Sequence, residues 1–313
     1  AIPPTMESLD PEEQRVARHA ISKSLGVFCE VSENCAENPI ACENTPFRFE
    51  TADTVIKDLQ NSSISWRDID REYQNQEIKL RAINYRNSNP TIVDANGQIV
   101  DNENCLASEE ATTLAGPNLE SYTTDEIVPL GMGFGAETDD GRLSFGPELG
   151  FGLKIAQTVA TPTILKVTMG GSTLNDSWRK SGTLYQSLIT ETKRLLEEEG
   201  LGLGGFIWFQ GFNDQFEDAY CNPLPERYET NLRQFLGNLR EDFNIPNLPV
   251  VIVGARSEGE LTTILVAQKK VVSEDVKTEF VVTDDLSDCF HYGSGSQILI
   301  GERIGEKIME LIR

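Results

Sequence analysis

Apolar, strand-like runs alternate with helical segments from about residue 127 to the end of the chain. Each strand-like run is separated from the next by a helical segment of a dozen or more residues, which is the length that a crossover between parallel strands requires. The pattern therefore predicts an α/β fold, a three-layer α/β/α sandwich with a central parallel sheet. The predicted strands lie within residues 162–171, 204–211, 248–255 and 279–286, and the predicted helices follow Pro147 and span residues 184–200, 225–243, 261–274 and 296–313.

The N-terminal part lacks this regular alternation of strands and helices. Asp10 and Pro11 suit the start of a helix, because Asp accepts the free backbone N–H groups and Pro fits the first helical position, so we predict a helix over about 11–24. We divide the chain into a cysteine-bearing segment, residues 1–46, and an α/β domain, residues 47–313. Within that domain, the polar stretch at about 85–125 indicates a long loop or insertion.

Charge, hydrophobicity and cysteine content limit the kinds of partner and compartment that the protein can have. The chain has 27 Lys and Arg against 50 Asp and Glu, a net charge of −23, which argues against nucleic acid because a polyanion would be repelled. The sequence has no apolar run of about 18 residues, so it predicts no transmembrane segment. Six cysteines with no C-x-x-C pair and only two histidines predict disulfides and argue against a metal site. The start at Ala1 and not at Met suggests either a removed leader or a sequence that begins late in the protein, and with the cysteines we expect a secreted protein or one in an organelle lumen.

Residues suited to catalysis follow three of the predicted strands. Gly170 and Gly171 follow the first strand, Asn213 follows the second, and Asp288 and His291 follow the last. Ligands bind at the carboxyl ends of the strands in such sheets. Backbone N–H groups at a Gly-Gly turn and an Asn amide can form an oxyanion hole. An Asp three residues before a His can orient the imidazole, which then serves as a general base.

Four segments, "FGPELGFG", "KVTMGGSTLNDSW", "WFQGFND" and "DLSDCFHYGSGSQILIGERIG", resemble in order and spacing the sialate O-acetylesterase-like and acetylxylan-esterase-like branch of the SGNH hydrolases. The resemblance covers roughly residues 127–313 and implies an SGNH-hydrolase-like, flavodoxin-like fold that deacetylates sugars without a cofactor. It assigns Gly170 or Gly171 and Asn213 to the oxyanion hole, His291 as the base and Asp288 as its orienting acid. Phe145-Gly146-Pro147-Glu148 matches a family segment near the pocket.

The sequence departs from the family at the nucleophile. Family members carry Gly-Gln-Ser-Asn or Gly-Asp-Ser after their first strand, and residues 1–144 contain no Gly-x-Ser-Asn. Ser32, after the apolar run "GVFCEV", is the nearest substitute, although it lacks the preceding glycine. Ser172 is a second candidate and is better interpreted as a turn residue beside the oxyanion hole. Phe212 stands where this branch usually has Glu. We name as candidate substrate-binding residues Ser172, Phe212, Gln210 and Trp178.

Two functions stay open at this point. The first is a carbohydrate O-acetylesterase with a Ser-His-Asp mechanism acting on an acetylated glycan. The second is a catalytically inactive descendant of the fold that binds glycans or serves as a subunit of a protein assembly. The missing Gly-x-Ser favours the second, whereas Asp288, His291 and Asn213 favour the first.

Overall fold

The computed structural model describes part of the chain. The described residues are 28–29, 48–49, 75–85, 92–93, 112–113, 121–123, 126–131, 145–157, 162–216, 223–255, 261–286, 292 and 294–312. The predicted helix over 11–24 and all cysteines except Cys29 lie outside them.

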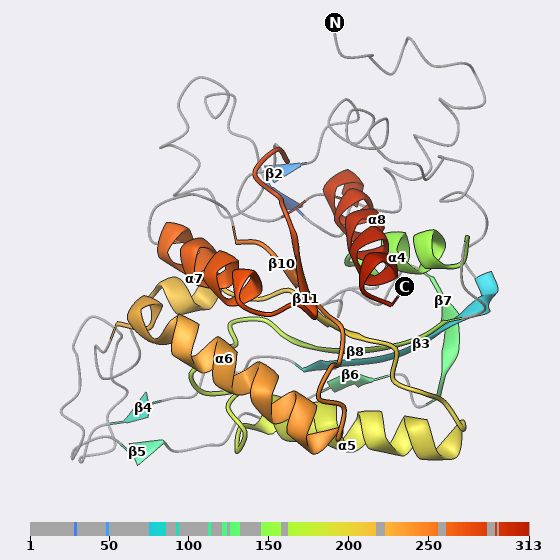
Figure 1. Cartoon of the computed structure of the whole chain (residues 1–313), viewed down its shortest axis with the longest axis horizontal. Helices are drawn as coiled ribbons and strands as arrows, with labels where there is room; N and C mark the ends of the chain where they lie inside the picture. The colour runs from blue at the N-terminus through green and yellow to red at the C-terminus, as the bar shows by residue number, and fades with distance from the viewer. Residues whose placement is uncertain are drawn as a thin grey trace, which may run out of the picture.

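A parallel sheet forms the centre of the fold (Figure 1). In one part, β10 (Val250–Val253) pairs in parallel with both β9 (Phe206–Trp208) and β11 (Thr278–Val281). In the other part, β3 (Asn75–Tyr85) pairs in parallel with β8 (Thr163–Met169) and antiparallel with β6 (Ser121–Thr123) and β7 (Val128–Leu130). The predicted strands correspond to β8, β9, β10 and β11, so the predicted parallel sheet is confirmed.

Helices cover both faces of this sheet. α5 (Thr183–Glu198), α6 (Pro225–Asp242) and α7 (Leu261–Ser273) pack on one face, and α4 (Glu148–Ile155) and α8 (Ser294–Leu311) pack on the other (Figure 1). Alternate residues of β10 show this directly, because Val250 and Ile252 belong to the first core and Val251 and Val253 to the second. Side chains of β8, β9, β10 and β11 contribute to both cores, so the two parts of the sheet form one central layer. The predicted α/β/α sandwich is confirmed.

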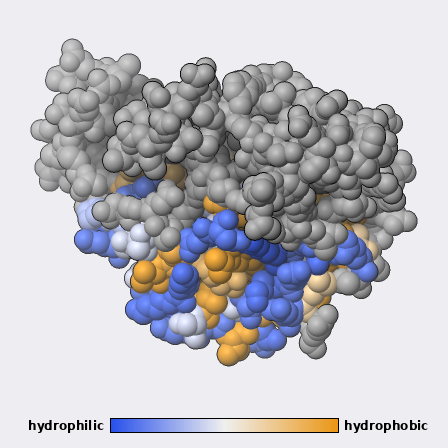
Figure 2. All heavy atoms as spheres, turned by 90° about the horizontal axis from the view of Figure 1, so that it is seen from above, coloured by the Kyte–Doolittle hydropathy of each residue, from blue (hydrophilic) through white to orange (hydrophobic). Residues whose placement is uncertain are grey.

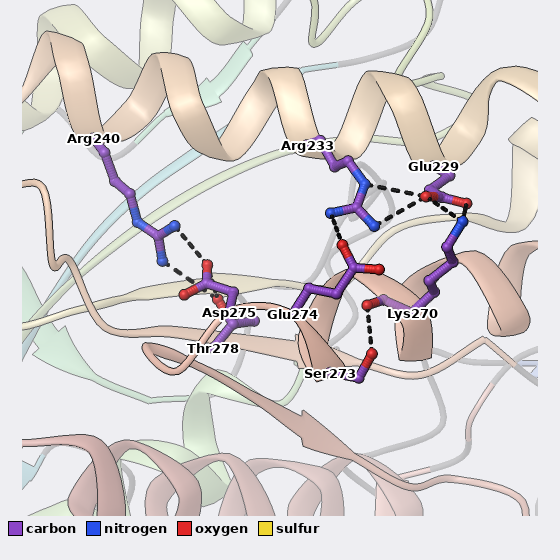
Figure 3. A network of polar contacts seen from close by, with 8 residues as sticks. All are labelled: Glu229, Arg233, Arg240, Lys270, Ser273, Glu274, Asp275 and Thr278. Carbon is purple, nitrogen blue, oxygen red and sulfur yellow. Dashed lines mark hydrogen bonds and ion pairs between the residues drawn. The ribbon is translucent and has the colours of Figure 1, made fainter.

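Each helical layer has its own means of close packing. On one face, Gly301 of α8 lies against α4 so closely that a Cβ there would stand 2.1 Å from the carbonyl oxygen of Pro147. On the other face, ion pairs join α6 to α7: Glu229 contacts Arg233 and Lys270, and Arg233 contacts Glu274 (Figure 3). These contacts fix the helices against a sheet whose central strand, β10, is fully buried.

Short strands lie within the predicted polar insertion at about 85–125 and upstream of it. The short strands β4 (Ile92–Val93), β5 (Thr112–Thr113) and β6 lie within it, so it is not loop throughout. The two-residue strands β1 (Phe28–Cys29) and β2 (Arg48–Phe49) pair with each other upstream. The boundary predicted between residues 46 and 47 stays a prediction.

The coloured part of Figure 2 shows the hydropathy of the surface that the described residues form. On the face seen in Figure 2, hydrophilic side chains separate the hydrophobic ones into small groups. None of the helices described is long and apolar enough to cross a bilayer.

Candidate active site

The turn after β8 presents backbone groups. Gly171 has a φ of 71°, in the left-handed region that glycine adopts without a steric penalty, and it is exposed. Gly170 before it is half-buried. The predicted Gly-Gly turn is therefore present, with its backbone open to a ligand at the carboxyl end of the strand.

The next residue, Ser172, is engaged in the interior. Its hydroxyl donates to the carbonyl oxygen of Met169 at 2.9 Å and accepts the indole N–H of Trp178 at 3.1 Å. Trp178 is 5% exposed and packs edge-on against Trp208, with 5.1 Å between the ring centroids. These contacts fit the interpretation of Ser172 as a turn residue. The substrate contacts proposed for Ser172 and Trp178 stay predictions.

The turn after β9 depends on a glycine for two reasons. Gly211 has a φ of 146°, and a Cβ there would lie 2.8 Å from Cγ2 of Ile264. This conformation turns the chain from β9 into the 3-10 helix η3 (Phe212–Gln215). Asn213 lies in η3, is half-buried, and makes no side-chain hydrogen bond within the described part of the chain. Its amide is therefore available to a ligand.

The two turns are joined by side chains. Gln210 Nε2 donates to the carbonyl oxygen of Ser172 at 3.0 Å and to Asp214 Oδ2 at 2.5 Å. Asp214 in turn accepts the backbone N–H of Leu174 at 3.1 and 3.0 Å. Because the residues that follow β8 contact those that follow β9, the carboxyl ends of both strands meet at one edge of the sheet. Gly171 and Asn213 are thus brought to the same edge.

A second layer of polar side chains supports the backbone of Gln210. Its carbonyl oxygen accepts from the hydroxyl of Tyr228 at 3.0 Å and from Nε2 of Gln268 at 3.1 Å. Gln268 Oε1 accepts the backbone N–H of Ala255 at 2.7 Å, which links the end of β9 to the residues after β10. Burial raises the pKa of Tyr228, so this hydroxyl is a neutral donor.

The segment predicted to lie near the pocket packs against β8. Glu148 is buried and accepts from the backbone N–H of Gly146 and from Nζ of Lys166, both at 2.9 Å. Lys166 lies in β8, three residues before its end. Phe145 is buried beside them. The segment is thus held on the face of β8 that carries α4.

Three predicted catalytic residues, Ser32, Asp288 and His291, lie outside the described residues. The residue after His291 is described: the hydroxyl of Tyr292 donates to Oγ1 of Thr283 at 2.8 Å, and Thr283 donates to the carbonyl oxygen of Gly254 at 3.1 Å. Thr283 and Gly254 follow β11 and β10, so Tyr292 is fixed at the same edge of the sheet as Asn213. The residues described contain no group of three or more His, Cys, Asp or Glu side chains placed to hold a metal ion.

The sequence analysis missed β3. This strand pairs with β8 over seven residues, from Lys79 opposite Thr163 to Tyr85 opposite Met169. Ser88 follows the end of β3 by three residues in the sequence "RNSN", as Ser172 follows the end of β8. Ser88 lies outside the described residues. A search for Ser-Asn that required neither the glycine nor a predicted strand would have found it.

A family model described as "Carbohydrate esterase, sialic acid-specific acetylesterase" matches residues 128–310, which is more than half of the chain. The chain belongs to this carbohydrate esterase family. The resemblance predicted from the four motifs is thereby confirmed, and the match begins within a residue of the boundary predicted at 127. The strand β3 lies upstream of the matched region.

Individual members of the carbohydrate esterase family are more distant. A probable carbohydrate esterase of Arabidopsis thaliana is 28% identical over 134 residues, which are 39% of this chain and 47% of that protein. The chain thus matches about half the length of this curated relative. A crystal structure of an Arabidopsis thaliana protein is similar with a TM-score of 0.49 at 20% identity, covering 62% of this chain and 79% of that one. A carbohydrate acetylesterase from Xanthomonas citri gives a TM-score of 0.47 at 13% identity, covering 75% of this chain and 49% of that one.

Proposed function

We propose that the protein is a carbohydrate O-acetylesterase in which a serine attacks the acetyl carbonyl and the backbone of Gly171 and the amide of Asn213 stabilise the oxyanion. The observation that carries this proposal is the meeting of the two turns at one sheet edge, with an open glycine backbone on one and an unbonded Asn amide on the other. Preorganised donors of this kind lower the barrier because they face the charge that develops in the transition state. Membership of the carbohydrate esterase family supports the ester substrate.

For the base we propose His291, oriented by Asp288. Its chain neighbour Tyr292 is anchored through Thr283 to the carboxyl ends of β10 and β11, which supports a position for His291 at this edge. In the reaction, His291 accepts the proton of the serine hydroxyl as the acyl bond forms. It then delivers this proton to the departing sugar oxygen, which leaves as a hydroxyl group. Water hydrolyses the acetyl-serine by the same route and releases acetate.

For the nucleophile we propose Ser88 in place of Ser32. The parallel neighbours β3 and β8 end in register at Tyr85 and Met169, so β3 ends at the edge of the sheet where Gly171 lies, which supports a position for Ser88 there. Ser88 and Asn89 match the last two residues of the family's Gly-Gln-Ser-Asn, with Arg86 and Asn87 in place of the first two. Ser32 has no comparable support, since the only described strand near it, β1, pairs with β2 and not with the central sheet.

A sugar substrate fits the aromatic rings at this edge. Phe209, the residue after β9, is 37% exposed and lies 5.7 Å from the ring of Tyr292. Phe212 lies 5.9 Å from Phe216, which is 53% exposed. Aromatic faces with one side open to solvent are suited to the apolar face of a sugar ring. We therefore assign sugar stacking to Phe209 and Phe216, with Phe212 packed between Phe216 and the first core, and not to Trp178, whose ring is in the core.

The test combines acetate release from an acetylated sugar with labelling by a fluorophosphonate probe and peptide mapping. We expect the wild type to release acetate and to be labelled at Ser88. Ser88→Ala should abolish both, His291→Ala should abolish labelling, and the matched variant Ser32→Ala should retain both. Label on Ser32 would contradict our choice of nucleophile but keep the activity. A folded, full-length chain with neither label nor acetate release would contradict the enzyme and favour the inactive, glycan-binding alternative.

A further inference from the structure

The carboxylate of Asp214 lies between the two turns that carry the oxyanion donors. It is fully buried in η3. Both of its oxygens contact the backbone N–H of Leu174, on the far turn, and Oδ2 also accepts from Gln210. Since Leu174 is forty positions away in the sequence, this contact depends on the tertiary fold. A single side chain thus connects the residue after Asn213 with the segment three residues beyond Gly171.

The partners of Asp214 are neutral donors. The ion pairs of the described residues do not include it, and Gln210 and two backbone N–H groups, of Leu174 and Asn175, satisfy it instead. Among the described residues, the hydroxyl of Tyr228 on α6 is the titratable group that interacts with it, and that hydroxyl donates its own hydrogen bond to the carbonyl oxygen of Gln210. A carboxylate that is buried without a cation costs free energy, so stability alone does not explain an Asp at this position.

Gln210 also joins the turn after β8 to the turn after β9. Its Nε2 donates both to Asp214 and to the carbonyl oxygen of Ser172, so it binds the residue that follows Gly171 directly. Its Oε1 is buried and has no donor among the described residues. The orientation of this amide is therefore set by the two acceptors of its nitrogen, one of which is Asp214.

We propose that Asp214 is a positioning residue: its ionised carboxylate, through Leu174 and Gln210, fixes the distance between the oxyanion donors Gly171 and Asn213. This inference rests on the proposed function, because it assigns these two donors to the stabilisation of one oxyanion. Donors that must face the same atom lose most of their effect when their spacing shifts by about 1 Å. A rigid connection behind them is therefore a requirement of the chemistry.

The connection depends on pH. Burial raises the pKa of Asp214 to about 6, although its hydrogen bonds from Gln210, Leu174 and Asn175 act in the opposite direction. Below this pH the carboxyl carries a proton on one oxygen, and that oxygen becomes a donor and a weaker acceptor for the surrounding N–H groups. The acid limb of activity does not isolate this effect, because the proposed base is also a histidine, and an unperturbed histidine titrates at about 6.5.

The first test is Asp214→Asn, which keeps the volume but places an NH₂ group against N–H donors. We expect kcat to fall by about 10- to 100-fold with KM within about twofold, since the lost contact serves the transition state and not ground-state binding. Gln210→Met is the second variant, which removes the amide bridge without adding a charge, and it should lower kcat in the same way. Asp275→Asn is the matched control, because Asp275 is a half-buried carboxylate remote from the site, and kcat should be unchanged there. Unchanged kcat in both Asp214→Asn and Gln210→Met, with the proteins folded, would overturn the proposal.

The second test does not need activity. In the ¹H–¹⁵N spectrum of the full chain, the amide of Leu174 should titrate with a midpoint near 6, and the amides of Gly171 and Asn213 should move with the same midpoint. Asp214→Asn should abolish all three transitions, whereas His291→Ala should leave them in place. A Leu174 titration without movement of Gly171 and Asn213 would overturn the positioning role. If the wild type releases no acetate, the proposed function fails, and this titration alone decides whether Asp214 couples the two turns.

Discussion

Two aspartates at opposite edges of the sheet make a useful comparison. Asp214 lies at the carboxyl edge, behind the candidate active site, and Asp275 lies at the amino edge, three residues before β11 begins. Both are removed from water to some degree and both are hydrogen-bonded. Their partners differ, because Asp214 has neutral donors only and Asp275 has a cation.

The contacts of Asp275 are those of a stabilising ion pair. Its Oδ2 accepts from Nη1 of Arg240 at 2.5 Å and from the hydroxyl of Thr278 at 2.8 Å (Figure 3). Its other oxygen accepts the backbone N–H of Lys277 at 2.9 Å. Burial raises the pKa of Asp275, but the hydrogen bonds from Arg240, Lys277 and Thr278 together outweigh it and hold the pKa below its usual value.

The difference shows how the two edges of one sheet divide their tasks. At the amino edge, Asp275 ties the end of α6 to the start of β11 and is most stable when ionised. At the carboxyl edge, Asp214 is held in a state that burial disfavours, and its pKa of about 6 reflects that cost. Strain of this kind is expected where a site needs fixed geometry. The stabilising ion pair and the proposed active site thus lie at opposite ends of the strands of one sheet.

The largest effect that would sharpen this contrast is expected from Asn213→Ala at the carboxyl edge. Loss of one oxyanion donor should lower kcat by about 10²–10³. The unfolding free energy should change little, because the side chain is half-buried and has no hydrogen bond within the described residues. Acetate release and thermal melting of the same preparation measure the two quantities. A large fall in melting temperature with unchanged kcat would reverse our assignment of this edge.

The next effect is a pH dependence of opposite sign at the two aspartates. Between 3.8, the usual pKa of an aspartate, and about 6, folded Asp214 binds a proton that the unfolded chain does not. The unfolding free energy of the wild type should therefore rise relative to Asp214→Asn as the pH falls from 7 to 4, by at most about 3 kcal/mol. For Asp275 the folded pKa is lowered, so its contribution is present above the unfolded pKa and is lost as the pH falls through the folded value. Denaturant titrations at several pH values test both signs, and parallel curves for wild type and Asp214→Asn would contradict the first.

A smaller effect is expected at the amino edge from Asp275→Asn. Asp275 is 21% exposed and its partner Arg240 is 18% exposed, so this ion pair is intermediate between a surface pair and a buried one. We therefore expect the unfolding free energy to fall by about 2 kcal/mol. Arg240→Gln should have a similar effect, and the double variant should lose less than the sum of the two. Additive losses would mean that the two groups act independently.

The smallest effect is expected from Ser172→Ala. The substitution leaves the buried indole N–H of Trp178 without its acceptor, which should cost about 1 kcal/mol of unfolding free energy. If Ser172 is a turn residue, kcat should fall by less than about tenfold, since no covalent step depends on it. Complete loss of fluorophosphonate labelling in this variant would instead identify Ser172 as the nucleophile.

Much of the fold followed from local pattern. The helices from α4 onward and the strands from β8 onward were predicted because their apolar residues recur with the period of one buried face or form short, fully buried runs. β3 was not predicted, since a strand buried on both faces is expected to be continuously apolar and this one contains Lys79 and Arg81. Arg81 is 8% exposed and lies 3.6 Å from Glu191 of α5, a partner that the sequence does not reveal. The missed strand concealed Ser88.

The candidate site, like the fold, was predictable from the sequence only in part. The sequence by itself determined which residues follow the strands and where the chain must turn sharply, because the conformations of Gly171 and Gly211 are local properties of glycine. Only the tertiary structure decided that Ser172 is held in the interior and that Asp214 joins the two turns. The burial and pKa of Asp214 and its hydrogen bond from Leu174, forty positions away, depend on the tertiary fold, and no local pattern encodes such a neighbour.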